Sequence, residues 1–305
     1  ESLKANTTGT ANTAIGKIAL CANTTGSCNV AIGVEAMDSN TTGGGNVGIG
    51  TDSLQGNTEG SSNVSIGDDT MKTNSTGSCN TAVGAGALCN NSAFGFKALE
   101  ANTTGTNNSA FGKDALLANT TASQNVAIGS LSSVTTTTGC KNTAVGHASF
   151  YNNSTGDNNT ALGNFALNDN TTADDNTAVG YFALKANTTG ANNTAVGRCA
   201  LANNTDSRQN TGIGNIALFD NTEGEFNTAV GSQSLADNTT ADCNVAVGYT
   251  SLRKNTTGTS NTSVGTFSLA CNTTASFNTA VGYEALTCNI TGANLTAVGF
   301  KALCR

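Results

Sequence analysis

The sequence of 305 residues is poor in most of the features that mark an ordinary globular domain. It contains no Pro and no Trp, aromatic residues make up 5%, charged residues make up 11%, and there is a single His. Hydrophobic residues nevertheless reach 37%, which is too many for a disordered tract. A chain of this length usually forms two domains. This composition instead favours order through repetition.

These absences exclude several classes of function. The formal net charge of −7 is spread along the chain, whereas a nucleic-acid-binding protein needs a concentrated basic face. No stretch approaches the ~18 consecutive apolar residues of a membrane span, and no hydrophobic segment of a secretory signal is present. Because the chain opens inside a repeat, with ESLKANTTGT, we expect a mature or partial product whose targeting segments lie elsewhere.

The sequence also lacks a catalytic or metal-binding constellation. The one His, His147, has no Ser or Cys partner in any recognisable motif, so no catalytic triad is expected. Neither a Cys-x-x-Cys pair nor the Gly-rich Asp motif of calcium-binding β-rolls occurs. The acidic pairs Asp68–Asp69 and Asp174–Asp175 are expected on a solvated face. We therefore predict that the protein is not an enzyme and binds no cofactor or metal.

What the sequence has in abundance is one repeated phrase, 17 residues long, as in NTAVGYFALKANTTGAN from Asn176 to Asn192. We number its positions from 1 at the first Asn. Eighteen copies follow a partial leading copy at 1–11. Every step from one copy to the next is 17 residues except that from Asn80 to Asn91, where the copy at 80–90 has 11 residues. That copy lacks positions 12 to 17, which suggests a framework at positions 1 to 11 and a detachable excursion at positions 12 to 17. We predict a single continuous repeat domain over 12–305, with a local defect at 80–90.

The pattern within each copy predicts short β-segments joined by turns. Position 5 is always Gly, position 4 is Val, Ile, Leu or Phe, position 3 is mostly Ala, and position 9 is mostly Leu. We expect a β-segment at positions 2 to 4, a Gly turn, a second short segment at positions 6 to 10, and an Asn-Thr-Thr-Gly turn. Helices are disfavoured, since Thr, Asn and Gly are poor helix formers.

Short strands at a fixed period, with no Pro to break a hydrogen-bond ladder, indicate an all-β fold: a parallel β-solenoid, or β-roll, of 17-residue coils. Each coil would advance about 4.8 Å, the spacing between strands. Identical residues would then stack in columns of Val, Leu, Ala, Asn and Thr. Stability would come from neighbouring coils, because a single coil buries little.

Apolar residues sit side by side at positions 3–4 and again at 8–9, and neighbours in a strand point to opposite faces. One face would fill the thin coil, and the other would leave a hydrophobic stripe larger than a soluble monomer normally exposes. We therefore expect self-association into a homo-oligomer or filament. The alternative is a monomeric solenoid of near-triangular section with both columns inside.

The run NTAVGYFALKANTTGANNTAVG resembles the head repeats of trimeric autotransporter adhesins. It resembles more closely the Asn-Thr-Ala-Val-Gly arrays of bacterial and phage tail-fibre-domain proteins. The resemblance covers nearly the whole chain. It implies a left-handed parallel β-roll or solenoid, often trimeric, that works as a surface fibre or an adhesin stalk.

The excursion carries most of the Asn-x-Ser/Thr acceptor sequences for N-glycosylation. An αL turn also favours Asn, so any single acceptor sequence is equally well explained by turn structure. Their regular placement on the segment expected to face water predicts a row of covalent glycans. The candidate sites are Asn6, Asn23, Asn40, Asn74, Asn102, Asn119, Asn153, Asn170, Asn187, Asn238, Asn255, Asn272 and Asn289.

The ten Cys residues form an even set, which suggests an oxidising compartment and an extracellular, cell-surface or virion-surface location. Cys271 and Cys288 share position 11 of consecutive coils, so stacking would bring them within disulfide range. Weaker candidate pairs are Cys79 with Cys89 and Cys21 with Cys28. No partner is evident for Cys304.

Three functions remain open from the sequence. The first is a structural protein of an extracellular fibre, a rod-like repeat scaffold with a row of N-glycans. The second is the shaft of an adhesin or receptor-binding fibre. The third is an ice-binding solenoid with Thr ladders. Aromatic residues at positions 6 and 7, such as Tyr181 and Tyr249, favour packing between chains over sugar stacking.

Overall fold

The protein is built from short β-strands and turns. The structure is a computed structural model that describes residues 1–84, 86 and 91–304, and these residues include no helix. The chain divides into two compact units, Glu1–Lys141 and Asn142–Arg305. The boundary between the units falls between two full-length repeats, and the shortened repeat at 80–90 lies within the first unit.

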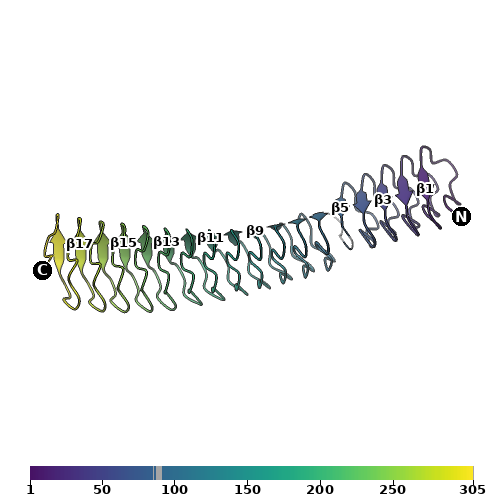
Figure 1. Ribbon diagram of the computed structural model, residues 1–305. Helices are drawn as coiled ribbons and strands as arrows, with labels where there is room; N and C mark the ends of the chain where they lie inside the picture. Colours follow the sequence, from purple (N-terminus) through teal and green to yellow (C-terminus); the bar gives the residue numbers. More distant parts are fainter. Residues whose placement is uncertain (85, 87–90, 305) are drawn as a thin grey trace. The chain divides into compact units, whose positions relative to one another are not determined.

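Each repeat contributes one three-residue strand at its positions 2 to 4, and the strands follow one another coil by coil within each unit (Figure 1). The first unit contains β1 (Thr13–Ile15), β2 (Val30–Ile32), β3 (Val47–Ile49), β4 (Val64–Ile66), β5 (Thr81–Val83), β6 (Ser92–Phe94), β7 (Ser109–Phe111) and β8 (Val126–Ile128). The second unit contains β9 (Thr143–Val145), β10 (Thr160–Leu162), β11 (Thr177–Val179), β12 (Thr194–Val196), β13 (Thr211–Ile213), β14 (Thr228–Val230), β15 (Val245–Val247), β16 (Thr262–Val264), β17 (Thr279–Val281) and β18 (Thr296–Val298).

Within each unit every strand pairs in parallel with the strand of the next repeat, and equal positions face each other. In the second unit Ala178 of β11 pairs with Ala195 of β12. In the first unit β5 and β6 also pair in register, with Thr81 opposite Ser92, so the shortened repeat leaves the sheet continuous. This register confirms the predicted all-β parallel solenoid of 17-residue coils.

The Gly at position 5 turns the chain out of the strand. Its φ lies between +127° and +143° in all eighteen copies, a conformation that residues with a Cβ atom rarely adopt. The next coil also lies very close: a Cβ atom on Gly180 would lie 2.5 Å from the carbonyl oxygen of Gly197. Both constraints explain why position 5 never varies.

Positions 7, 9 and 17 take the left-handed conformation, mostly without Gly. Their non-Gly residues have φ between +48° and +63°, which costs roughly 1–2 kcal/mol per residue. Hydrogen bonds between coils offset this strain. The position-7 amide of Cys199 donates to the Tyr181 carbonyl oxygen of the coil before (2.9 Å). The position-9 amide of Leu184 donates to the Ala200 carbonyl oxygen of the coil after (3.0 Å).

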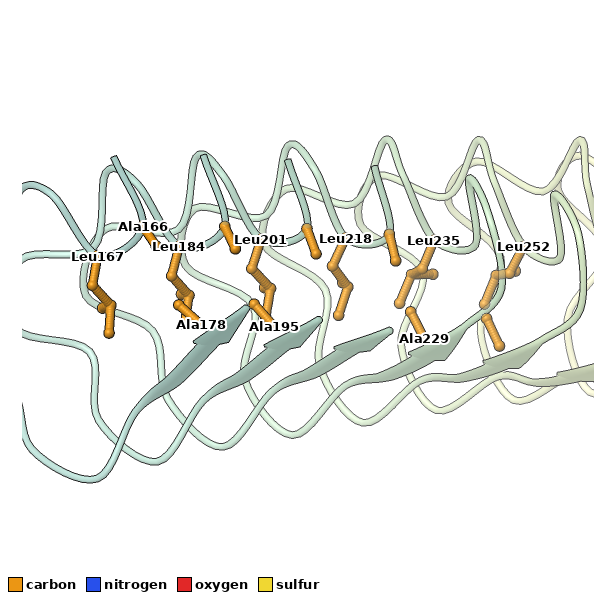
Figure 2. Close-up of a cluster of buried hydrophobic side chains, with 14 of the residues drawn as sticks. Ala166, Leu167, Ala178, Leu184, Ala195, Leu201, Leu218, Ala229, Leu235 and Leu252 are labelled. Atoms are coloured by element: carbon orange, nitrogen blue, oxygen red, sulfur yellow. The ribbon is translucent and has the colours of Figure 1, made fainter. Parts of the chain in front are cut away.

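The core is a thin stack of small apolar residues and Leu. Ala at positions 3 and 8 and Leu at position 9 fill it, as in the column from Leu167 to Leu252 of the second unit (Figure 2). The sequence-based expectation that positions 8 and 9 point to opposite faces, within a second short β-segment, is wrong. Ala183 and Leu184 are both fully buried, because this segment is a series of turns with a left-handed residue at position 9.

We predict that Gly180→Ala lowers the free energy of unfolding by roughly 1–3 kcal/mol from backbone strain alone, with a further loss from the clash with Gly197. The measurement is urea denaturation followed by circular dichroism.

Gly190→Ala at position 15 is the matched control. A Cβ atom on Gly190 would also lie close to the next coil, 2.2 Å from the carbonyl oxygen of Ser207, but Gly190 lacks the positive φ of Gly180. Other coils carry Ala at this position, for example Ala173 and Ala241, so we expect a smaller loss. Equal destabilisation by the two substitutions would contradict the special role of position 5.

Candidate functional site

The side of each strand that faces away from the core presents a regular apolar surface. We call the side chains at positions 2 and 4 of the strands of one unit its strand face. In β11, for example, Ala178 is buried between the half-buried Thr177 and Val179. Position 4 reaches higher exposure elsewhere, such as 43% for Ile128 in the first unit and 39% for Ile213 in the second. The predicted hydrophobic stripe on the outer surface is therefore present at position 4.

The strand face contains no charged side chain. Position 2 is Thr, Val or Ser throughout, and position 4 is Val, Ile, Leu or Phe. In the second unit position 4 comprises Val145, Leu162, Val179, Val196, Ile213, Val230, Val247, Val264, Val281 and Val298. Depletion of charge distinguishes the centre of a protein interface from the rest of a protein surface.

Aromatic side chains gather on the strand face of the first unit and beside that of the second. In the first unit Phe94 and Phe111, both at position 4, stack with ring centroids 4.9 Å apart. In the second unit aromatic rings at positions 6 and 7 contact each other from coil to coil, as Tyr283 and Phe300 do at 5.5 Å. Phe300 is 73% exposed. These rings extend the apolar surface beyond the strands.

The Asn residues at position 12, which we expected to face solvent, form a buried ladder instead. Asn187 is fully buried. Its Nδ2 donates to Oδ1 of Asn170 (3.0 Å) and to the carbonyl oxygen of Gly190 (2.9 Å), and its own Oδ1 accepts from Nδ2 of Asn204 (2.9 Å). The prediction that the Asn side chains at position 12 face solvent is therefore wrong.

The ladder conflicts with glycosylation of the folded chain. A glycan would be attached to Nδ2, the atom that makes both donated hydrogen bonds. Eleven of the thirteen candidate Asn residues are at most 5% exposed: Asn23, Asn40, Asn74, Asn102, Asn119, Asn153, Asn170, Asn187, Asn238, Asn255 and Asn272. Asn6 and Asn289 are half-buried, and their Nδ2 atoms donate to Gly9 and Gly292 of their own turns. A row of glycans on position 12 does not fit this packing.

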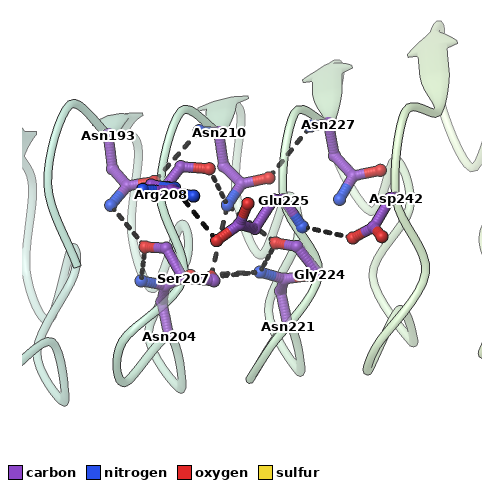
Figure 3. Close-up of polar contacts among 10 residues, drawn as sticks. All are labelled: Asn193, Asn204, Ser207, Arg208, Asn210, Asn221, Gly224, Glu225, Asn227 and Asp242. Carbon is purple, nitrogen blue, oxygen red and sulfur yellow. Dashed lines mark hydrogen bonds and ion pairs between the residues drawn. The ribbon is translucent and has the colours of Figure 1, made fainter.

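A second Asn ladder at position 1 holds the opposite end of the excursion. The backbone amide of Asn193 donates to Oδ1 of Asn176 (2.9 Å), and its Nδ2 donates to the carbonyl oxygen of Ser207 (2.9 Å). Figure 3 shows the same two bonds at Asn210 and the backbone bond from Asn227 to Asn210. The sequence predicted that Asn residues stack in columns, but not that two such columns are buried in the interior.

Between the described residues, no disulfide joins the predicted pairs Cys271–Cys288 and Cys21–Cys28. Cys271 and Cys288 do occupy position 11 of consecutive coils, but both thiols are free, as are those of Cys21, Cys28 and Cys79. Cys89 lies outside the described residues.

No partner for Cys304 is evident from the sequence, and the last coil places this residue beside Cys288. The pKa of the Cys304 thiol is raised, first by desolvation and then by the charge of Cys288 and that of Glu284. Cys288 also forms a hydrogen bond with this thiol. The two sulfur atoms are therefore close neighbours.

Charged groups form ion pairs at the surface. Nζ of Lys72 lies 2.8 Å from a carboxylate oxygen of Asp52 and 2.8 Å from one of Asp69. These hydrogen bonds, with Asp52 the larger cause, raise the pKa of Lys72 above its ordinary value. His147 is exposed, and its ring packs perpendicular to that of Phe165, with the ring centroids 5.4 Å apart.

Within the part of the chain that the structure describes, no group of three or more His, Cys, Asp or Glu side chains is arranged to hold a metal ion. None of the described residues belongs to a helix that is long and apolar enough to cross a membrane.

Comparison with protein-family models and with curated proteins finds no match to this chain.

We predict that Asn187→Ala lowers the free energy of unfolding by about 2 kcal/mol or more. The substitution leaves the amide oxygen of Asn170 buried without a donor and removes an acceptor from Asn204. Urea denaturation measures the change.

Thr189→Ala is the matched control, because it destroys the same acceptor sequence at an exposed residue. We expect it to leave stability unchanged and, in a glycosylating host, to leave the mass of the folded protein unchanged apart from the substitution. Loss of a glycan mass on Thr189→Ala would contradict the buried ladder.

Proposed function

We propose that the chain is a structural repeat scaffold whose copies associate with one another through the strand face. The observation that carries the proposal is the uncharged, partly exposed column at position 4, which continues through every repeat of each unit. In this proposal the repeats build a fibre, and the ladders inside each coil keep the columns in register.

The size of the strand face supports a role in association. In the second unit ten strands at about 4.8 Å spacing give a strip about 43 Å long and, with three residues per strand, roughly 10 Å wide. Contiguous apolar patches of a few hundred Å² on a soluble protein are commonly functional. The exposed rings of Tyr181, Tyr249 and Tyr283 beside the strip add to this area.

An identical chain is the partner that fits best. The columns repeat every coil, so a second copy presents the same spacing along the whole strip. Self-complementary contacts of this kind are the rule in homo-oligomers. The strip itself carries no charge, so two copies do not place like charges opposite each other in the contact.

We predict that Val196→Lys combined with Ile213→Lys converts the protein from an oligomer to a monomer, because two ammonium groups would be buried in the contact. Sedimentation velocity at micromolar concentration measures the state, and circular dichroism checks that the fold is retained.

The control is Thr189→Lys combined with Asp206→Lys, which adds the same side chains at exposed position-14 sites away from the strand face. We expect this variant to remain oligomeric. A wild-type protein that sediments as a monomer at all concentrations would refute the proposal.

Ice binding is a second candidate, favoured by the regular face of the second unit. Position 2 is Thr in every strand of this unit except β15, and position 4 is aliphatic in all ten. Hydroxyl and methyl groups therefore alternate on a surface with one fixed repeat. The same face cannot serve both functions at once, because association would cover it.

We predict for this second candidate that a monomeric wild-type protein shows a thermal hysteresis gap that Thr177→Lys combined with Thr194→Lys removes. Nanolitre osmometry measures the gap. Retention of the gap in this variant, or its absence from the wild type, rejects ice binding.

A further inference from the structure

The shortened repeat leaves a slot in the side of the first unit opposite its strands. The coil that starts at Asn80 has no positions 12 to 17, so the excursion at 74–79 is followed directly by the excursion at 102–107. Two open cavities lie between them. One, of about 240 Å³, is lined by residues 73–77 and 102–106. The other, of about 540 Å³, is lined by residues 78–80, 91–92 and 106–109.

In complete coils, backbone hydrogen bonds join successive excursions in a fixed pattern. The amides at positions 13 and 14 both donate to the position-13 carbonyl oxygen of the next coil, as Thr58 and Glu59 donate to Ser75 (2.8 and 3.2 Å). The amide at position 17 donates to the position-16 carbonyl oxygen of the previous coil, as Cys79 donates to Ser61 (2.9 Å). Each excursion is thus bonded on both sides.

At the slot these hydrogen bonds are missing from the facing edges of the two excursions, 74–79 on one side and 102–107 on the other. On the first edge the amides of Ser75 and Thr76 and the carbonyl oxygen of Ser78 take part in none of these bonds. On the second edge the same holds for the carbonyl oxygen of Thr103 and the amide of Asn107. All five residues are exposed, so their backbone groups are accessible to an incoming chain.

We propose that this slot, defined by residues 73–80 and 102–109, binds an extended peptide segment of the Asn-Thr-Thr-Gly-x-x type supplied by a partner chain. The segment would take the place of the missing positions 12 to 17. This binding site is independent of the strand face.

The hydrogen-bonding groups of such a segment match the edges one by one. Its position-13 carbonyl oxygen accepts from the amides of Ser75 and Thr76, and its position-13 amide donates to Thr103. Its position-17 amide donates to Ser78, and its position-16 carbonyl oxygen accepts from Asn107. Addition of a peptide backbone to an edge with unpaired groups is a general mode of peptide recognition.

The side chains of the motif fit for the same reason. The Asn at its position 12 would enter the buried column between Asn74 and Asn102, where the ladder is interrupted. In most complete coils Nδ2 of the position-12 Asn donates to Oδ1 of the Asn in the coil before, as Asn204 donates to Asn187. The Asn of the segment would accordingly donate to Oδ1 of Asn74 and accept from Nδ2 of Asn102.

The test uses the full chain and a fluorescein-labelled peptide, acetyl-Asn-Thr-Thr-Gly-Ser-Asn-amide, in fluorescence anisotropy titrations. We expect saturable binding with a Kd below about 1 mM, a modest affinity because six residues must be ordered. The control peptide has Pro in place of the first Thr, so it lacks the amide that donates to Thr103. We expect it to bind at least about tenfold more weakly, a loss of about 1.4 kcal/mol.

A matched protein variant fills the slot. Insertion of Asn-Thr-Thr-Gly-Ser-Ser directly before Asn91 restores a 17-residue copy, and circular dichroism verifies its fold. We expect the variant to lose peptide binding and to unfold at a higher urea concentration than the wild type. Equal binding of the peptide by both proteins, equal binding of both peptides, or no binding by the wild type at millimolar concentration would each overturn the proposal.

Discussion

Hydrogen bonds between successive coils, most of which join residues 16 to 18 positions apart, are the interaction on which the rest of this fold depends. They join the strands, the two Asn ladders and the left-handed residues at positions 7 and 9 of successive coils. A single coil has almost no core of its own, and three of its residues occupy a costly backbone region. Only a neighbouring coil in exact register supplies the partners that make this conformation favourable, as nearest-neighbour stabilisation in repeat proteins requires.

The sequence predicted the framework of the coil well, because the framework follows from local rules. Invariant Gly at position 5 marks a turn that other residues cannot adopt, and the alternation of Thr, Ala and Val at positions 2 to 4 marks a half-buried strand. The second half of the coil was harder. Left-handed Leu at position 9, as in Leu184, is a tertiary effect with no signature in a single copy, so the inward direction of positions 8 and 9 was missed.

The candidate site, like the coil, was predictable from the sequence only where local rules decide the structure. The apolar outer column at position 4 was predictable from the strand period. The burial of Asn187 was not predictable, because Asn in an Asn-Thr-Thr-Gly turn fits both an exposed acceptor site and a buried ladder. The choice depends on the neighbouring coil, whose Asn170 and Asn204 lie within hydrogen-bond distance. Polar residues inside a repeat protein can thus form part of its core, since a buried Asn amide can bond to the identical amide of the neighbouring coil, as Asn187 does to Asn170.

The fixed register also has a consequence for how such a chain changes in evolution. Recombination between repeats in the gene adds or removes whole copies, and every remaining residue keeps a partner of the same type. Length can therefore vary in steps of one coil without new packing problems. The 11-residue copy is a change of a different kind, because it keeps the strand pairing of β5 with β6 but removes one side of a coil. The strand pairing thus keeps its register across such a gap.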